Sequence, residues 1–131
     1  MFLDTSGLLC LADDTEPRHL DAVAIAQSVH KAVTHSYVLS EFVALANSRR
    51  IDRRLALRFL DGVRQEPKIE IVYVDEPLHL KAMDLLRGRF DKSWSLCDAV
   101  SFELMERIGL TEALTTDHHF EQAGFVRLLN A

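Results

Sequence analysis

The chain has 131 residues, 48% of them hydrophobic and 27% charged, which suits one globular domain with its own core. The formal net charge of -5 excludes a protein that coats nucleic acid through general basic charge, although an enzyme with local basic patches is still allowed. No apolar run approaches the roughly 18 residues of a membrane span, and no signal peptide is recognisable, so we expect a cytoplasmic protein without a membrane partner.

Short apolar runs alternate along the chain with longer segments whose apolar residues recur at helical spacing. The first half is predicted to form a strand at 2–3, helices at 6–12 and 17–29, a strand at 32–35, and helices at 37–48 and 53–65. The second half is predicted to form a strand at 68–75 buried on both faces, helices at 77–89 and 95–108, a strand at 113–116, a short helix around Phe120 and a strand at 126–129. This alternation predicts an α/β fold in which a mostly parallel sheet carries helices on both faces. We expect a single domain over residues 1–131.

Four carboxylates stand at the ends of predicted strands or near the starts of helices: Asp4, Glu41, Asp98 and Asp117. No Lys or Arg lies within two positions of any of them, and their neighbours are largely apolar. Ligands bind at the carboxyl ends of parallel strands, so the four are expected at one edge of the sheet. Carboxylates beside a core need compensation of their charge, and a shared divalent cation would supply it. The pattern predicts a metal-dependent hydrolase, with a phosphodiester as its substrate.

Each acid also has a purely structural interpretation. Asp4 and Asp117 are placed to cap the helices that follow them, Ser95 and Asp98 have the spacing of a capping box, and Glu41 fits a solvated helix position. The structural interpretation weakens when the four are considered together, because capping does not require strands that end at a common edge.

At these positions the sequence resembles the PIN-domain nucleases, most closely the VapC-type toxin ribonucleases of toxin–antitoxin pairs. The resemblance rests on FLDTSGLL at 2–9, LSE at 39–41, DKSWSLCDAVSF at 91–102 and LTTDHHFEQAGF at 114–125. It implies a PIN-like domain, Mg²⁺- or Mn²⁺-dependent endoribonuclease activity, an RNA substrate and a cognate antitoxin protein. The family's acidic positions map onto the same four residues, and hydroxyls near its site correspond to Thr5, Ser6 and Thr116. Cys97 departs from a common Thr, and His118 from a common basic residue.

Hard cations such as Mg²⁺ and Mn²⁺ prefer carboxylate oxygens, and they acidify bound water. We expect Asp4 and Asp98 to hold the main metal, and Asp117 to add a ligand directly or through water. Glu41 is expected to orient or deprotonate the attacking water.

Several other residues have two interpretations. His118 and His119 suit either a phosphate contact or exposed positions at a helix start, the commoner case. Candidate RNA contacts are Arg49, Arg50, Arg53 and Lys92, although the arginines equally suit a solvated helix face. Phe42, Leu45, Leu55 and Phe59 are expected to pack two helices together or to present an apolar groove to a partner helix. Cys10 and Cys97 are expected to be buried free thiols, and a homodimer is plausible.

Three other functions compete with the nuclease. A phosphoester hydrolase of the haloacid dehalogenase type would use Asp4 as a nucleophile, but it needs a second Asp where Ser6 stands. A receiver-like phosphotransfer protein would use Asp75, but it lacks the nearby acidic pair. A non-catalytic RNA-binding module would have no use for four matched carboxylates.

Overall fold

The computed structural model describes residues 1–130 and contains one five-stranded sheet with the order β3-β2-β1-β4-β5. Every neighbouring pair of strands is parallel. The strands are β1 (Phe2–Leu3), β2 (Ala32–His35), β3 (Ile69–Val72), β4 (Glu112–Leu114) and β5 (Val126–Arg127). The chain builds outward from β1 to β3 and then returns to add β4 on the other side of β1. The direction of winding therefore reverses between β1 and β4, where sheets of this kind bind ligands.

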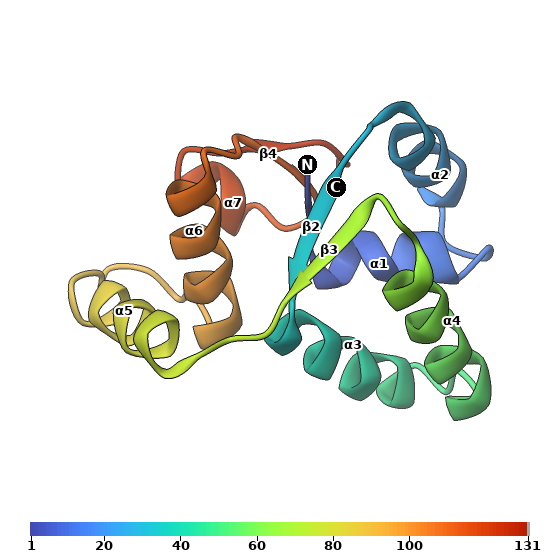
Figure 1. Cartoon of the computed structure of the whole chain (residues 1–131), viewed down its shortest axis with the longest axis horizontal. Coiled ribbons are helices and arrows are strands. Elements are labelled where there is room, and N and C mark those ends of the chain that lie inside the picture. The colour runs from blue at the N-terminus through green and yellow to red at the C-terminus, as the bar shows by residue number, and fades with distance from the viewer. Residues whose placement is uncertain (131) are drawn as a thin grey trace.

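Helices cover the sheet on both sides, as the alternating sequence pattern predicts (Figure 1). On one side lie α1 (Thr5–Ala12), α2 (His19–Ser28), α3 (Ser36–Ser48) and α4 (Arg53–Gln65). On the other lie α5 (Glu76–Arg87), α6 (Leu96–Ile108) and α7 (His119–Gln122). Among residues 1–130, no helix has the length and apolar character needed to cross a membrane.

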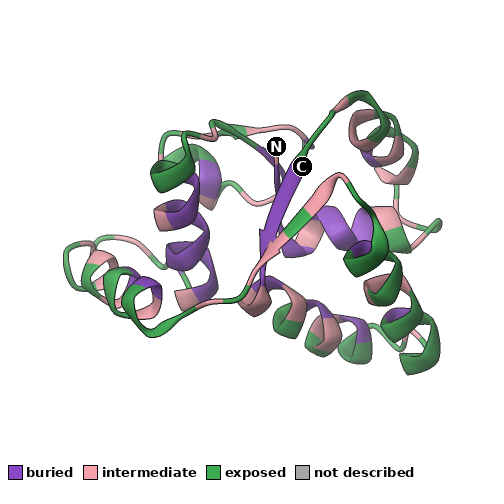
Figure 2. Cartoon of the chain, in the orientation of Figure 1, coloured by how far each residue is buried: buried purple, intermediate pink, exposed green. Residues whose placement is uncertain are grey.

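The core is centred on the middle strands and on the helices that face them (Figure 2). Phe2 and Leu3 are almost fully buried, although successive side chains of a strand point to opposite faces of the sheet. The Phe2 ring stacks on Phe120 with ring centroids 6.1 Å apart, which joins β1 to α7. Because β1 is enclosed on both faces, Asp4 leaves the strand directly from the core.

The first helix packs unusually close to the sheet. A Cβ atom built on Gly7 would lie 2.0 Å from the backbone oxygen of Leu114, so α1 approaches β4 at a distance that only glycine permits. This contact holds the start of α1 against the end of β4.

Some predicted elements differ from the structure. The strand at 68–75 is wrong in length and burial, because β3 ends at Val72 and is an edge strand with Glu70 exposed and Tyr73 66% exposed. The last two strands are also shorter than predicted. The second helix begins at His19, since Pro17 lies in the preceding turn. Cys10 and Cys97 are buried free thiols, as predicted.

Candidate metal centre

Asp4 stands at the carboxyl end of the central strand and is only 5% exposed. Its Oδ2 accepts hydrogen bonds from Thr115 Oγ1 at 2.7 Å and from Ser6 Oγ at 3.3 Å. Its side chain makes no capping hydrogen bond to α1. The two hydroxyls come from the segments that follow β4 and β1, so neighbouring strands hold this carboxylate between them.

Asp98 lies in the first turn of α6 and is 8% exposed. It forms a complete capping box with Ser95: the Asp98 N–H donates to Ser95 Oγ at 3.0 Å, and the Ser95 N–H donates to Asp98 Oδ2 at 3.1 Å. The capping box predicted from the sequence is therefore present, and its hydrogen bonds fix the orientation of the Asp98 carboxylate. The same Oδ2 also contacts Nδ1 of His119 at 2.9 Å.

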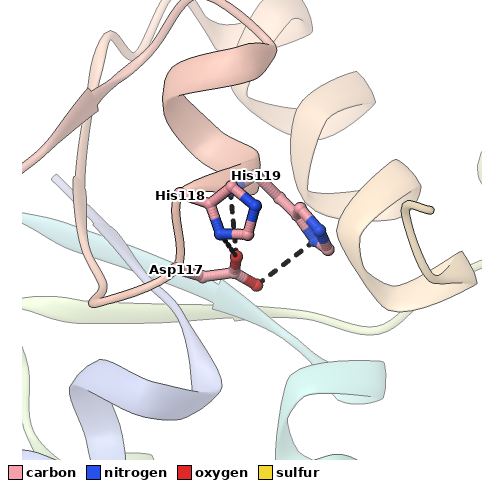
Figure 3. A group of neighbouring side chains, drawn as sticks. All are labelled: Asp117, His118 and His119. Atoms are coloured by element: carbon pink, nitrogen blue, oxygen red, sulfur yellow. Dashed lines mark hydrogen bonds and ion pairs between the residues drawn. The ribbon is translucent and has the colours of Figure 1, made fainter. Parts of the chain in front are cut away.

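Asp117 follows β4 and lies beside two histidines (Figure 3). Its Oδ1 accepts the backbone N–H of His119 at 2.9 Å, and its Oδ2 lies 3.5 Å from the ring Nδ1 of the same histidine. His118 Nδ1 is 3.7 Å from Asp117 Oδ1. The backbone N–H of Asp117 donates to Thr115 Oγ1 at 3.0 Å. Asp117 is thus connected to Asp4 through Thr115 and to Asp98 through His119.

Glu41 lies in the second turn of α3 and is exposed. The start of α3 is anchored by the buried His35, whose Nδ1 accepts the Val38 N–H at 3.3 Å and whose Nε2 donates to Ser101 Oγ on α6 at 2.8 Å. Burial lowers the pKa of His35 from 6.5 to about 3, so the ring is neutral and its two nitrogens have distinct roles. This connection sets the position of α3 relative to α6, and with it that of Glu41 relative to Asp98.

The carboxylates influence one another electrostatically. Burial raises the pKa of Asp4 from 3.8 to about 7, hydrogen bonds from Thr115 and the Thr5 backbone oppose the rise, and the charges of Asp98 and Glu41 add to it. Burial, with the charges of Glu41, Asp4 and Asp98, also raises the pKa of the Cys97 thiol. The charges of three of the four acids therefore act on the same thiol.

The residues present fit a divalent cation. Within residues 1–130, no Lys or Arg forms an ion pair with any of the four acids, so their charge is compensated only by hydrogen bonds and nearby histidines. An ion would replace the proton that Asp4 otherwise holds near neutral pH. In the described part of the chain, one group of side chains has possible ligand atoms within 4.8 Å of one another, namely Asp117, His118 and His119.

The supporting residues differ in part from those chosen by sequence. Ser6 bonds to Asp4 and accepts the Thr116 N–H at 3.0 Å, so Thr116 participates through its backbone. The Thr5 hydroxyl is buried without a hydrogen-bond partner. Thr115 and the ring of His119, which sequence reasoning did not select as supports, make the shortest side-chain contacts to the acids.

The candidate RNA contacts lie in two places. Lys92 belongs to segment 88–95 between α5 and α6, next to Ser93, whose Oγ is 3.4 Å from His119 Nε2. Arg49, Arg50 and Arg53 lie where α3 meets α4, and Arg49 is ion-paired with Glu16. Arg49 lies eight residues beyond Glu41, about 12 Å along the helix axis.

The junction of α3 and α4 also forms an apolar groove of about 340 Å³. Phe42 and Phe59 line it with their ring centroids 5.4 Å apart, and Leu55 lines it while 56% exposed. Phe42 and Phe59 therefore pack α3 against α4, as one interpretation expected, whereas the exposed Leu55 fits the alternative of an open apolar groove.

A parallel sheet with four acidic side chains near its switch point fits a nuclease-like α/β domain. The PIN domain family model matches residues 1–126, and the chain belongs to this family. Its relatives include the 23S rRNA-specific endonuclease VapC20 of Mycobacterium tuberculosis, 30% identical over 129 residues that cover 98% of this chain and 97% of the relative. A VapC ribonuclease of Archaeoglobus fulgidus is 27% identical over 100 residues, which cover 70% of this chain and 61% of that protein.

The crystal structure of the M. tuberculosis VapC20, described as a sarcin-ricin loop cleaving toxin, superposes with a TM-score of 0.86 at 29% identity. The match covers 95% of each chain. The fold, including its parallel sheet and flanking helices, is thus shared with a VapC toxin along almost its whole length.

Proposed function

We propose that this protein is a metal-dependent endoribonuclease that hydrolyses RNA phosphodiester bonds, and that it is the toxin of a type II toxin–antitoxin pair. The observation that carries the proposal is a pair of nearly buried carboxylates, Asp4 and Asp98, beside Glu41 and Asp117 at the switch point of the sheet. Membership of the PIN family and similarity to VapC ribonucleases support RNA as the substrate.

Asp4 and Asp98 would hold Mg²⁺ or Mn²⁺, with Asp117 as a further ligand directly or through water. A bound divalent cation supplies neutralisation of phosphate charge and a lowered pKa of nearby water. Thr115, Ser6 and Ser95 orient the two buried carboxylates by hydrogen bonds to their Oδ2 atoms. Glu41 is exposed in the second turn of α3, where solvent reaches it, and it would orient the attacking water or accept its proton.

Substrate contacts and compartment follow from this role. Lys92 suits a phosphate contact, because its segment meets His119 beside the acids. The arginines at 49, 50 and 53 stay a prediction as RNA contacts, since they lie farther along α3 and around the groove. A protein that cleaves cellular RNA is expected to act in the cytoplasm. The homodimer stays a prediction, which analytical ultracentrifugation would test.

The groove between α3 and α4 is the proposed binding site of the antitoxin. It combines an apolar floor of Phe42, Leu55 and Phe59 with three acids, Asp13, Asp14 and Asp52, and one basic residue, Arg50, so the net charge of its lining is negative. An amphipathic segment with apolar anchors and basic neighbours complements this surface. The substitution Leu55→Asp is expected to abolish binding of the cognate antitoxin, while RNA cleavage by the free protein persists.

The test of the nuclease activity is cleavage of an RNA panel that includes a sarcin–ricin loop, with Mg²⁺, Mn²⁺ or EDTA. Asp98→Asn keeps an oxygen acceptor for the capping box but loses the charge, so it should fold and not cleave. Glu106→Gln is the matched control, because Glu106 is an exposed acid on the same helix. Cleavage that survives in EDTA or in Asp98→Asn refutes the proposal, as does a folded, metal-binding protein that leaves every RNA intact.

A further inference from the structure

Two adjacent histidines at the metal centre have very different environments. The His118 side chain is 66% exposed, whereas that of His119 is 17% exposed. The His119 ring faces Asp117 (Figure 3), and it also contacts Asp98. The sequence interpretation of exposed helix-start histidines therefore describes only His118. His119 is a partly buried polar group whose contacts are nearly all to acids of the proposed site.

His119 contacts Asp98 at one carboxylate oxygen only. Its Nδ1 lies 2.9 Å from Asp98 Oδ2, the oxygen that also accepts the Ser95 N–H. A carboxylate only accepts hydrogen bonds, so Nδ1 is assigned the proton. In the described chain, no hydrogen bond reaches Oδ1 of Asp98. One oxygen is thus held by two donors while the other is available to a cation.

The same histidine also restrains Asp117. Its backbone N–H donates to Asp117 Oδ1 at 2.9 Å, and its ring Nδ1 stands 3.5 Å from Asp117 Oδ2. Asp98 belongs to α6 and Asp117 to the segment after β4, so His119 connects two acids from separate elements. Two carboxylates that contact the same imidazole repel each other, and a shared hydrogen-bond donor offsets this repulsion.

The ring itself is held from its far side. Ser93 Oγ lies 3.4 Å from His119 Nε2, on the segment that leads into α6. With Nδ1 protonated, Nε2 accepts from this hydroxyl, and the ring is held between Ser93 and the two acids. Partners of metal-binding carboxylates act in this way when they fix the direction of a ligand atom.

We infer that His119 is a positioning residue of the metal centre, whose Nδ1–H holds Asp98 Oδ2 and thereby directs Oδ1 of Asp98 to the cation while keeping Asp117 alongside. This inference rests on the proposed metal-dependent function. It assigns His119 no bond to the metal, and it predicts that the hydrogen-bond donor, rather than the imidazole, is what the site requires.

The test measures Mn²⁺ affinity of the metal-free protein by electron paramagnetic resonance, without any RNA. His119→Ala removes the donor and is expected to weaken Mn²⁺ binding by about 10- to 100-fold. His119→Asn places an amide N–H near the position of Nδ1, because both atoms are bonded to Cγ, and should restore most of the affinity. His30→Ala is the matched control, because His30 is an exposed histidine in the segment between α2 and β2, and it should leave affinity unchanged. Thermal unfolding of each variant confirms that it is folded.

Three results overturn the inference. Wild-type affinity in His119→Ala would show that the contact is dispensable. Equal loss in the Ala and Asn variants, with ¹⁴N coupling to Mn²⁺ in the wild-type spectrum, would make His119 a ligand instead. No Mn²⁺ binding by the wild-type protein would overturn both this inference and the metal dependence proposed above. Either of the first two results, together with Mn²⁺ binding by the wild-type protein, overturns this inference and leaves the proposed function standing, so the two failures are distinguishable.

Discussion

The pKa of Asp4 makes the stability of the metal-free protein depend on pH in a specific direction. The carboxyl group titrates near pH 3.8 when unfolded and near pH 7 when folded, because it is buried beside other acids. Between these values the folded state keeps a proton that the unfolded state has lost, so stability falls as pH rises. A difference of about 3 pKa units corresponds to about 4 kcal/mol, lost progressively from about pH 4 to pH 7.

The variant Asp4→Asn isolates this effect, since the amide cannot titrate. Wild-type stability alone would mislead, because His35 acts in the opposite direction: its folded pKa of about 3 lies below 6.5, so its contribution is lost as pH falls through that range. His35 is present in both proteins and cancels in the difference. We expect the free energy of unfolding of Asp4→Asn minus that of wild type to increase by about 4 kcal/mol across the interval.

Urea unfolding of both proteins in EDTA, from pH 4.5 to pH 8, measures the difference directly. Saturating Mn²⁺ at pH 7.5 should stabilise wild type far more than Asp4→Asn, because the cation takes the place of the proton. Parallel stability curves for the two proteins over the whole range would refute the reasoning, since they would mean that Asp4 titrates alike in the folded and unfolded states.

Three further changes test how the centre is built. Gly7→Ala should destabilise the protein by about 2 kcal/mol or more in thermal unfolding, because the added Cβ would lie 2.0 Å from the backbone oxygen of Leu114. Replacing Gly by Ala inside a helix usually stabilises it, so a stabilised variant would contradict the close approach of α1 to β4. Thr115→Val should lower the free energy of unfolding in urea by about 1–3 kcal/mol, because Asp4 and the Asp117 N–H lose the hydroxyl that both contact. Thr115→Ser keeps this hydroxyl and should retain most of the stability. Equal losses in the two variants would show that the methyl group matters instead. Ser95→Ala should cost about 1 kcal/mol by removing the cap of α6, and unchanged stability would argue against the capping box.

Much of the fold could be predicted because the spacing of apolar residues along the sequence indicates which face of each helix or strand is buried. Alternating strand and helix patterns predict parallel order, and parallel order alone brings the ends of β1 and β4 to one edge. The edge strand β3 was harder, since its apolar residues suit a central strand equally well. Its position depends on the order in which strands join the sheet, which no local pattern contains.

The details of the site depend on contacts between distant segments. Leu3 pairs with Leu114, so Asp4 and Thr115 follow as neighbours across the two strands, and this register selects Thr115 over Thr116 for the bond to Asp4. Nothing in the local sequence distinguishes His118 from His119. The packing of α7 against α6 turns the His119 ring inward and leaves His118 exposed. The requirement for glycine at position 7 likewise arises from a strand more than a hundred residues away.

These contacts explain how a protein can hold like charges together before a cation arrives. The acids come from separate elements, and the hydroxyls and N–H groups around Asp4, Asp98 and Asp117 are attached to rigid strands and helix ends. Such dipoles lower the pKa of a carboxylate without adding a positive charge, so they oppose the burial that raises the pKa of Asp4 and leave the site free for a metal. A lysine at any of these places would stabilise the metal-free fold more strongly, but it would compete with the ion. The absence of Lys and Arg pairs to these acids in residues 1–130 therefore suits a domain whose stability and activity both depend on a bound cation.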